Sequence, residues 1–500
     1  MLAPRRWMSV LLAAILTVTL AACTRPTPAP EEARDLAIGA TAEPNGLDMI
    51  TVPGAGTPFV LLYNVYETLV KLDGDGTVRP LLAAQWNIST DRLTYTFTLE
   101  GRAKFASGAP VDAEAVVASF ERARSSAATD QIRGKWAVVD TIAAKDDLTV
   151  EVTLKNPSNQ WLYDMTGPAG SVSDPTATAD LNTTPAGSGP FVFDAWDQGN
   201  SIDLVANEAY WGTPARFDEV TFRYFADPNA MSAAMLSGQL DIISNLTVPQ
   251  AIDQFKDTSR FTTYEGTTDG EVVLGFNHAT PALADLRVRQ AINHAIDRRA
   301  LVDAAWGGKG TLIGSMVPPT DPWFEDLSQA YPFDPEKAKT LLAEAGFATG
   351  LTLKLRVPNL PYAPPAARFI AAQLKDVGIT VEVEEIDFAR WLDQVYGQHD
   401  YDMTIVAHVE PRDMGAFAAE GNYWGYSNPD FNALLLEADA ASSTEQVRLL
   451  REAARMLSDD AAADWLFLLP NIIIATNDIS GIQANQISLS FDLTKLAARN

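Results

Sequence analysis

Apolar and polar residues alternate with a period of two along much of the first third of the chain. Residues 93–99 (LTYTFTL) and 148–154 (LTVEVTL) each place apolar side chains on one face, which predicts two half-buried strands. Between them, 109–123 carries apolar residues at helical spacing after Asp112, a residue suited to cap a helix N-terminus. Residues 191–205 predict a hairpin. We therefore expect this third to be rich in strands, with short helices.

The second half of the chain has a different rhythm, because strands and helices alternate there. Strands are predicted at 351–357, 379–383 and 401–408, with helical patterns around 369–377 and 391–395 between them. Three strands joined by helices through short connections predict right-handed crossovers and a parallel sheet. Ligands of such sheets bind beyond the carboxyl ends of the strands, so the residues that follow each strand are candidates for a site.

The start of the chain resembles a lipoprotein leader. A basic pair at 5–6 precedes an apolar run at 7–22, which is too short to span a bilayer as a helix. The run ends in Leu-Ala-Ala before Cys23, which resembles the lipobox of bacterial lipoproteins. We predict a signal peptide over 1–22, lipidation of Cys23 and a proline-rich linker over 23–33. In the alternative interpretation, the leader is an ordinary secretion signal and Cys23 is incidental.

Composition narrows the class of protein. Cys23 is the only cysteine among 500 residues, so no thiol remains for disulfides or thiolate chemistry in the folded part. The chain exceeds the size of one hydrophobic core, and two or three lobes are expected. A net charge of −27, scattered along the chain, disfavours nucleic acids and anionic lipid surfaces as partners.

Motifs of catalysis and metal binding are absent from the sequence. It contains no nucleophile elbow, zinc-peptidase helix or phosphate-binding loop, so we expect neither a catalytic centre nor a cofactor. The run DGDG at 73–76 begins like a calcium loop, but position 12 lacks the required glutamate, so a turn is predicted. His294 falls inside a helix predicted over 287–305. His399 and His408 stand at the two ends of one predicted strand, too far apart to share a metal.

The loop after the strand at 401–408 holds the candidate ligand-binding residues. His408 ends that strand, and Glu410, Arg412 and Asp413 crowd the turn that follows. A carboxylate in such a place can hold the ammonium group of a ligand, and an arginine can hold a carboxylate. The alternative interpretation is a surface patch of ion pairs.

An aromatic cluster follows the same loop. Tyr423, Trp424 and Tyr426 stand together between polar residues. They form either a rigid wall for a ligand or the packed core of the loop itself.

Seven stretches of the sequence are recognisable together, taken in their order along the chain. They are the run from NVYETLVKLDGDGTVRPLL to APVDAEAVVASFERA, then GSGPFVFDAW, NEAYWG, SGQLDII, DLRVRQAINHAIDRRALVDAAWGGKGTLIGSMVPP, DPEKAKTLLAEAGF and YSNPDFNALLLEA. Together they resemble the family 5 extracellular solute-binding proteins, the peptide/nickel-type binding lipoproteins of ABC importers. The resemblance covers the chain from about residue 34 to its end.

The resemblance implies an α/β fold of the periplasmic-binding-protein type (type II, large cluster). Two lobes enclose a ligand cleft, an extra β-rich subdomain is attached, and the chain crosses between the lobes twice. We expect the following domains: lobe I from 34–66, 186–270 and 478–500, its β-rich subdomain at 67–185, and lobe II at 271–477.

The resemblance also implies a transport role rather than an enzymatic one. The protein is expected to capture oligopeptides, close its lobes and deliver them to a permease, as a monomer anchored on the extracytoplasmic face of the membrane. In peptide binders of this family, a cleft aspartate beyond the YDM strand holds the peptide ammonium; Asp413 matches it by order. The local stretch departs from the family pattern, which leaves Glu410 as the alternative. Another solute (a sugar, an opine or a nickel chelate) and a surface hydrolase are the competing hypotheses.

Overall fold

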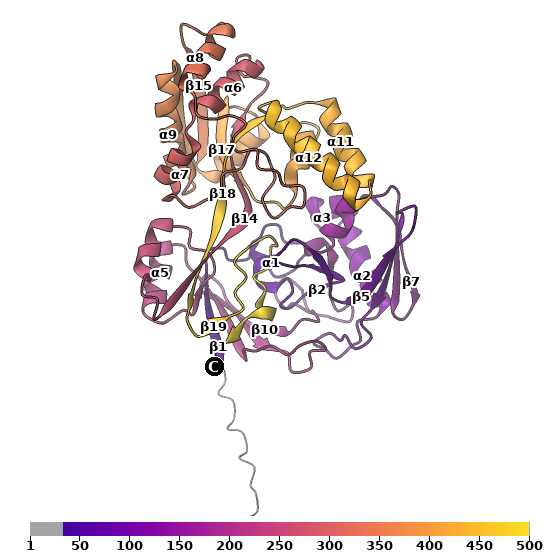
Figure 1. Ribbon diagram of the computed structural model, residues 1–500. Coiled ribbons are helices and arrows are strands. Elements are labelled where there is room, and N and C mark those ends of the chain that lie inside the picture. The colour runs from indigo at the N-terminus through magenta and orange to yellow at the C-terminus, as the bar shows by residue number, and fades with distance from the viewer. Residues whose placement is uncertain (1–33, 500) are drawn as a thin grey trace, which may run out of the picture. The chain divides into compact units, whose positions relative to one another are not determined.

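The computed structural model describes residues 34–499, so the predicted signal peptide (1–22), the linker (23–33) and the lipidation site Cys23 lie outside the described residues. The largest feature is a ten-stranded sheet shared by both lobes (Figure 1). Its strands, in spatial order, are β10 (Phe191–Asp197), β11 (Ser201–Ala206), β12 (Glu219–Tyr224), β1 (Asp35–Ala40), β13 (Ile242–Ile243), β18 (Ala463–Thr476), β14 (Phe261–Phe276), β17 (Met403–His408), β15 (Leu351–Pro358) and β16 (Ile379–Ile386).

Two long antiparallel strands, β14 and β18, connect the lobes. Phe261 lies opposite Thr476 in lobe I, and Gly275 lies opposite Ala463 in lobe II. The pairing shifts register between Thr267 and Glu271, so a bulge interrupts β14 part-way between the two ends. Figure 1 shows both strands running side by side from the lobe that carries α5 to the lobe that carries α7 and α9. They are the two crossings that the resemblance implies.

The end of β18 corrects one expected boundary. Residues 271–477 were expected to belong to lobe II, but Ile474 and Ala475 pair with β13, and Ile473 packs in the core of lobe I. The physical reason is the ladder itself. A strand that keeps its hydrogen bonds to β14 has to follow β14 into lobe I.

Lobe I combines parallel and antiparallel strands. β1 is parallel to β12 and β13, whereas β11 is antiparallel to β10 and β12, which confirms the hairpin predicted over 191–205. Among the described residues, the α-helices of this lobe are α1 (Gly56–Leu61) and α5 (Pro228–Leu236). Met231 and Met235 of α5 pack with Ile243 of β13 in a small core of their own.

The β-rich subdomain shares one continuous core with lobe I. Tyr95 and Phe97 pack against Trp161, and the side chain of Asp112 accepts a hydrogen bond from the backbone N–H of Ala115, as the predicted helix cap requires. The four-stranded sheet of the subdomain consists of β5 (Ala83–Ile88), β6 (Thr94–Leu99), β8 (Thr149–Leu154) and β7 (Val139–Asp146), and β6 and β8 confirm the two predicted strands. Two shorter pairs are β2 (Glu67–Thr68) with β9 (Ser171–Val172) and β3 (Val70–Leu72) with β4 (Val78–Pro80). The helices are α2 (Ala113–Arg124), α3 (Asp130–Lys135) and α4 (Asn159–Asp164).

Lobe II contains the parallel unit predicted from the alternating pattern. β15 is parallel to both β16 and β17, and α9 packs on all three, so strand, helix, strand, helix, strand is confirmed. Helices on both faces of the sheet bury two separate cores. The helices of this lobe are α6 (Leu286–Ala295), α7 (Arg298–Trp306), α8 (Pro335–Glu344), α9 (Ala363–Asp376), α10 (Phe388–Trp391) with the π-helical segment η3 (Leu392–Gly397), α11 (Pro429–Ala440) and α12 (Ser443–Asp459).

Two local predictions are wrong in this lobe. The single helix expected over 287–305 is divided into α6 and α7 at Ile296, because Asp297 turns extended and its side chain accepts a hydrogen bond from Ala300 N–H, capping a new helix. His399 does not start a strand. Its backbone is left-handed, with φ of 57°, and the strand begins later, at Met403.

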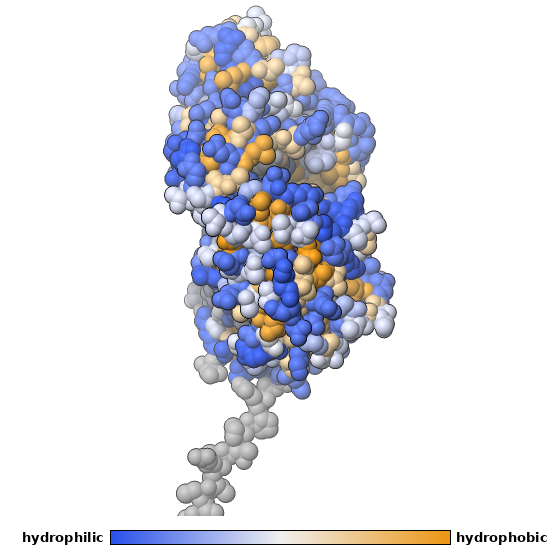
Figure 2. Space-filling view, turned by 90° about the vertical axis from the view of Figure 1, so that its right-hand side faces the viewer, coloured by the Kyte–Doolittle hydropathy of each residue, from blue (hydrophilic) through white to orange (hydrophobic). Residues whose placement is uncertain are grey.

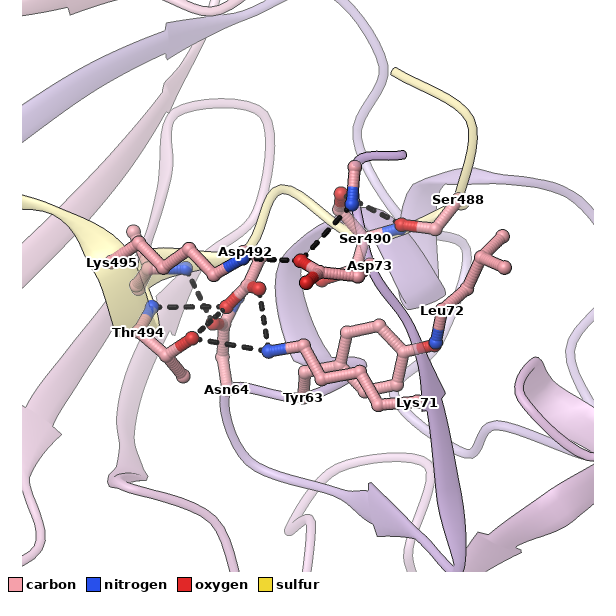
Figure 3. A network of polar contacts seen from close by, with 12 residues as sticks. Tyr63, Asn64, Lys71, Leu72, Asp73, Ser488, Ser490, Asp492, Thr494 and Lys495 are labelled. Atoms are coloured by element: carbon pink, nitrogen blue, oxygen red, sulfur yellow. Dashed lines mark hydrogen bonds and ion pairs between the residues drawn. The ribbon is translucent and has the colours of Figure 1, made fainter. Parts of the chain in front are cut away.

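The C-terminal segment returns to lobe I and is fastened there by polar contacts (Figure 3). The buried amide of Asn64 donates a hydrogen bond to the carbonyl of Phe491 at 2.8 Å and accepts one from the N–H of Leu493 at 3.0 Å. Lys71 Nζ lies 2.5 Å from Oδ2 of Asp492. Two short antiparallel strands pair within the segment, β19 (Ile479–Ser480) at its start and β20 (Ala497–Ala498) at its end. Residues more than 400 positions apart in sequence therefore form one wall of lobe I.

Candidate functional site

The segment that follows β17 lies where lobe II meets the β-rich subdomain. Glu410 shares a cavity of about 40 Å³ with Tyr163 of α4 and Ser488 of the C-terminal segment. Asp413 begins the 3-10 helix η4, which runs from Asp413 to Ala418. The residues beyond the carboxyl end of β17 are thus brought against the opposite lobe, as a ligand site of this fold requires.

Arg412 reaches from lobe II to the β-rich subdomain. Its guanidinium carbon lies 3.6 Å from the ring centroid of Tyr163 and 4.9 Å from that of Trp323, within the range of cation–π attraction. Its Nε lies 3.6 Å from Oδ1 of Asp321. The backbone of Arg412 is left-handed, with φ of 58°, which turns the chain sharply between β17 and η4. Arg412 therefore bridges the two sides of the cleft instead of lying on an open surface.

Four carboxyl groups near Arg412 lie close enough to repel one another, and we call them the acid group. Asp269 and Glu271 come from the bulge of β14, Asp413 from η4, and Asp321 from the loop before α8. Glu271 is only 2% exposed. Oε2 of Glu271 and Oδ1 of Asp413 have no hydrogen-bond partner among residues 34–499. Buried carboxylate oxygens without partners are costly, and a ligand can satisfy them.

The pKa values of the acid group follow from burial and crowding. Burial, reinforced by neighbouring carboxyls, raises the pKa of Asp269 and of Asp413 to about 8. Burial also raises the pKa of Asp321 to about 6, against the opposing effect of Arg412. The pKa of Glu271 is raised well above its ordinary value, first by burial and then by Asp413 and Asp269. At pH 7 these raised pKa values keep Asp269 and Asp413 mostly protonated. A cationic partner would lower both pKa values and stabilise the ionised carboxylates.

His408 adds no positive charge to the acid group. Burial lowers its pKa to about 4, so the ring is neutral at pH 7. Its Nδ1 lies 3.7 Å from Oδ2 of Asp413, and its Nε2 lies 2.8 Å from the hydroxyl oxygen of Tyr423. Trp424 stacks on Phe417 of η4 with ring centroids 4.0 Å apart. Tyr423 and Trp424 are buried in the core of lobe II, where they support the histidine and η4 from behind.

Among residues 34–499, the candidates Tyr426 and Glu410 make no hydrogen bond, ion pair or ring contact with the acid group, Arg412 or His408. The Tyr426 hydroxyl donates a hydrogen bond to the carboxylate of Asp460, at the end of α12, at 2.7 Å. Glu410 is exposed, and it acts on the group only through its charge, which helps to raise the pKa of Asp413. The structure thus brings together Asp413, Arg412 and His408 from the predicted set.

Sequence reasoning missed Asp269, Glu271, Asp321 and Tyr163. One signal was present for the first two, since they stand at the head of the apolar run VVLGF, where a charged residue is unusual without a partner. No local pattern marks Asp321 or Tyr163, because only the packing of the lobes places them beside Arg412.

A second, larger cavity also has Arg412 and Asp321 in its wall. Its volume is about 440 Å³, and most of its other lining residues belong to η4, α11 and α12, with Gln160 of α4 on the opposite side. The face of the molecule in Figure 2 is mostly hydrophilic, with smaller groups of hydrophobic residues between.

Two further properties concern the described part of the chain. Residues 34–499 contain no group of three or more histidine or acidic side chains arranged to hold a metal ion. Across the same residues, no helix combines the length and the apolar character that crossing a membrane demands.

Comparison with known families decides the class of protein. The family model described as bacterial extracellular solute-binding proteins, family 5 Middle, matches residues 77–430. The chain belongs to this family. Family 5 solute-binding proteins are extracytoplasmic binding proteins of ABC importers and not enzymes. The resemblance seen in the sequence is therefore confirmed, and so is the transport class.

Individual relatives agree with this assignment. The glutathione-binding protein GsiB of Salmonella paratyphi A is 30% identical over 67% of this chain, and the match spans 66% of that protein, just under two thirds of its length. The probable D,D-dipeptide-binding periplasmic protein DdpA of Escherichia coli is 28% identical, over 90% of this chain and 91% of that protein.

Solved structures support the fold of this family 5 protein. The periplasmic binding protein DppA from Helicobacter pylori, in complex with the peptide STSA, superposes with a TM-score of 0.78 and 23% identity, over 93% of this chain and 98% of that chain. At this identity the likeness concerns the fold, and it confirms the predicted two-lobed α/β architecture.

Proposed function

We propose that this family 5 protein is the lipid-anchored receptor of an ABC importer for oligopeptides, which closes its lobes on the peptide and delivers it to the permease. The observation that carries the peptide assignment is the acid group. Glu271 and Asp413 present buried oxygens without hydrogen-bond partners among residues 34–499, at the boundary of the lobes. Relatives with peptide ligands in their names or structures support the same solute class.

A peptide ammonium fits this site chemically. It brings one positive charge and three N–H donors. The acid group offers buried carboxyl oxygens that receive no hydrogen bond from residues 34–499. In our proposal the ammonium lowers the pKa of Asp413, which accepts its hydrogen bonds as a carboxylate, while Asp269 and Glu271 lie close enough to interact with Asp413 electrostatically. Charge-assisted hydrogen bonds of this kind are short and strong in a desolvated site. An anionic solute such as a carboxylate-rich chelate would raise the pKa values of these carboxyls further and so disfavour their ionisation.

Hydrogen bonds between the β-rich subdomain and the end of α11 join the two lobes. The side-chain amide of Asn159 donates to the carbonyl of Ala441, and the N–H of Gln160 donates to Asp439 Oδ1 at 2.8 Å. Arg92 donates to the same carbonyl of Ala441. These groups of the β-rich subdomain meet the carboxyl end of α11, where the helix dipole favours a cation. The bulge in β14 lies between the lobes and is a natural hinge.

The lipid anchor is a separate part of the proposal and rests on Cys23 and the residues before it. A diacylated cysteine gives stable attachment, and tethering raises the effective concentration of receptor near its permease. The variant Cys23→Ala, expressed in a bacterial host fed radiolabelled palmitate, is expected to lose the label and leave the membrane fraction. Unchanged labelling of that variant would refute the anchor without touching the binding function.

The binding function is tested by calorimetric titration of residues 24–500 with di- to hexapeptides, and with sugars, opines and nickel chelates in parallel. We expect peptides with a free ammonium to bind, and the same peptides to bind at least about tenfold more weakly when N-acetylated. Asp413→Asn is expected to weaken binding similarly, while Glu420→Gln, an exposed carboxyl in the same loop, serves as control. Binding of a sugar, opine or chelate without any peptide binding would keep the transport class and overturn the oligopeptide.

A further inference from the structure

The 440 Å³ cavity beside the acid group is mostly apolar. Its walls include Met316, Trp323, Met414, Leu435 and Leu450. Methionine side chains adapt to ligands of different shape, and apolar walls with few polar groups are typical of small-molecule sites. The volume falls in the lower part of the range for ligand pockets and exceeds the needs of a few ordered waters.

The cavity is continuous with the acid group. Arg412 and Asp321 line the cavity and also interact with the acid group directly. Asp413 stands between two lining residues, Arg412 and Met414, in the chain. Asp413 itself does not line the cavity, so the link between the acid group and the cavity is the shared pair Asp321 and Arg412.

Six of the fourteen residues that line the cavity have polar or charged side chains, and buried atoms of two of them, Asn432 and Arg412, have no hydrogen-bond partner among the described residues. The buried Oδ1 of Asn432 has no hydrogen-bond partner among the described residues. Leu436 lines the same cavity and is 76% exposed, which places an aliphatic surface in water at the rim. Gln160 is the lining residue from the β-rich subdomain, so an occupant of the cavity would contact both lobes.

We propose that the solute carries a bulky apolar group next to its cationic centre, and that this group fills the cavity between η4, α11, α12 and α4. In the simplest case the solute is a short peptide whose first side chain is leucine-like or phenylalanine-like. This inference rests on the proposed function and deepens it, because the ammonium enters the acid group while the side chain enters the cavity. Small or charged first side chains would leave apolar walls wet or bury a charge beside them.

A peptide series tests the inference. The soluble chain is titrated calorimetrically with the tripeptides X-Ala-Ala, where X is glycine, aspartate, leucine or phenylalanine. We expect leucine and phenylalanine to bind at least about tenfold more tightly than glycine, since even single methylene groups in a hydrophobic pocket change affinity by about that factor. Aspartate is expected to bind most weakly.

Two variants locate the preference. Ala418→Phe places a ring in the cavity and is expected to bring the leucine-to-glycine affinity ratio close to one. The matched control is Ala127→Phe, an exposed alanine outside the cavity, which is expected to keep the ratio of the unaltered protein. Because a phenylalanine in η4 can disturb folding, Leu436→Asp provides a second change at an exposed wall residue and is expected to lower the ratio. Circular dichroism verifies folding of all three.

The outcomes separate the inference from the proposed function. If no peptide binds the unaltered chain, the peptide proposal fails and this inference falls with it. If all four peptides bind equally, peptide binding stands and the apolar subsite is refuted. A preference for leucine that persists in both Ala418→Phe and Leu436→Asp also overturns the inference, because the apolar group would then lie elsewhere.

Discussion

Replacing Asp269 by asparagine is expected to stabilise the ligand-free protein, and to do so more strongly as the pH rises. The carboxyl of Asp269 is buried in the bulge of β14, and its pKa is raised to about 8 by burial and by its neighbours Asp321 and Asp413. In the unfolded chain an aspartate has a pKa of about 3.9. Folding must therefore keep this group protonated at neutral pH, which costs free energy that the neutral amide avoids.

The size of the effect follows from the linkage between protonation and folding. At pH 7 the gap to the unfolded pKa is roughly 3 units, and each unit corresponds to about 1.4 kcal/mol, so the carboxyl costs at most about 4 kcal/mol. The amide of asparagine needs hydrogen-bond acceptors in the same buried space, and the free oxygens of Glu271 and Asp413 can serve. We expect a gain of about 2 to 4 kcal/mol, which raises the melting midpoint by a few degrees in a chain of this size.

The assay is thermal unfolding of both proteins between pH 4 and pH 9. A raised pKa makes the wild-type group most favourable below the unfolded pKa and progressively unfavourable up to about pH 8. The midpoint difference should therefore be small near pH 4, grow to about pH 8 and then level off. Asp146→Asn is the control, because Asp146 lies in an exposed hairpin turn and its pKa is lowered by hydrogen bonds from Leu148 and Thr149. A difference that is absent at every pH, or that shrinks as the pH rises, would refute the reasoning.

Three further predictions concern the site and its frame. Binding of a cationic peptide should release protons from the acid group, so affinity should rise by up to about tenfold per pH unit from pH 6 to pH 8, checked by calorimetry in two buffers of different ionisation enthalpy. Asn64→Ala removes hydrogen bonds to Phe491 and Leu493 and should lower the free energy of unfolding by about 2 to 4 kcal/mol in urea titrations, whereas the exposed control Asn229→Ala should change little. Arg412→Ala removes the cation–π bridge between the lobes and should increase the radius of gyration of the ligand-free protein in small-angle scattering; an unchanged radius would contradict this role.

Several elements could be predicted from sequence because local forces form them. Residues 93–99 alternate between apolar and polar, and β6 forms there with the expected face buried. Asp112 caps α2 because its side chain accepts a hydrogen bond from a backbone group three residues away. The parallel unit of lobe II follows from helix and strand periods that repeat with short connections. The same locality explains one error, since the capping of α7 by Asp297 interrupted a helix whose apolar period was continuous.

The candidate site was only half predictable for the same reason. Asp413, Arg412 and His408 follow the end of one strand, so a rule about strand ends could find them. Asp269 and Glu271 join them because β14 is hydrogen-bonded to β17, with Glu271 opposite His408. That register depends on pairing between segments more than 130 residues apart, and no local pattern encodes it.

The sequence by itself predicted the class of protein, most of the strands and helices, and the candidate carboxylate Asp413 with its neighbours, because periodicity, capping and short motifs are local properties of the chain. Only the tertiary structure decided which side chains share the cleft. Tyr163 meets Arg412 across two lobes, and Asp321 joins the acid group from a separate loop. The pKa values of that group are equally tertiary, since burial and charge crowding arise only when distant segments exclude water together.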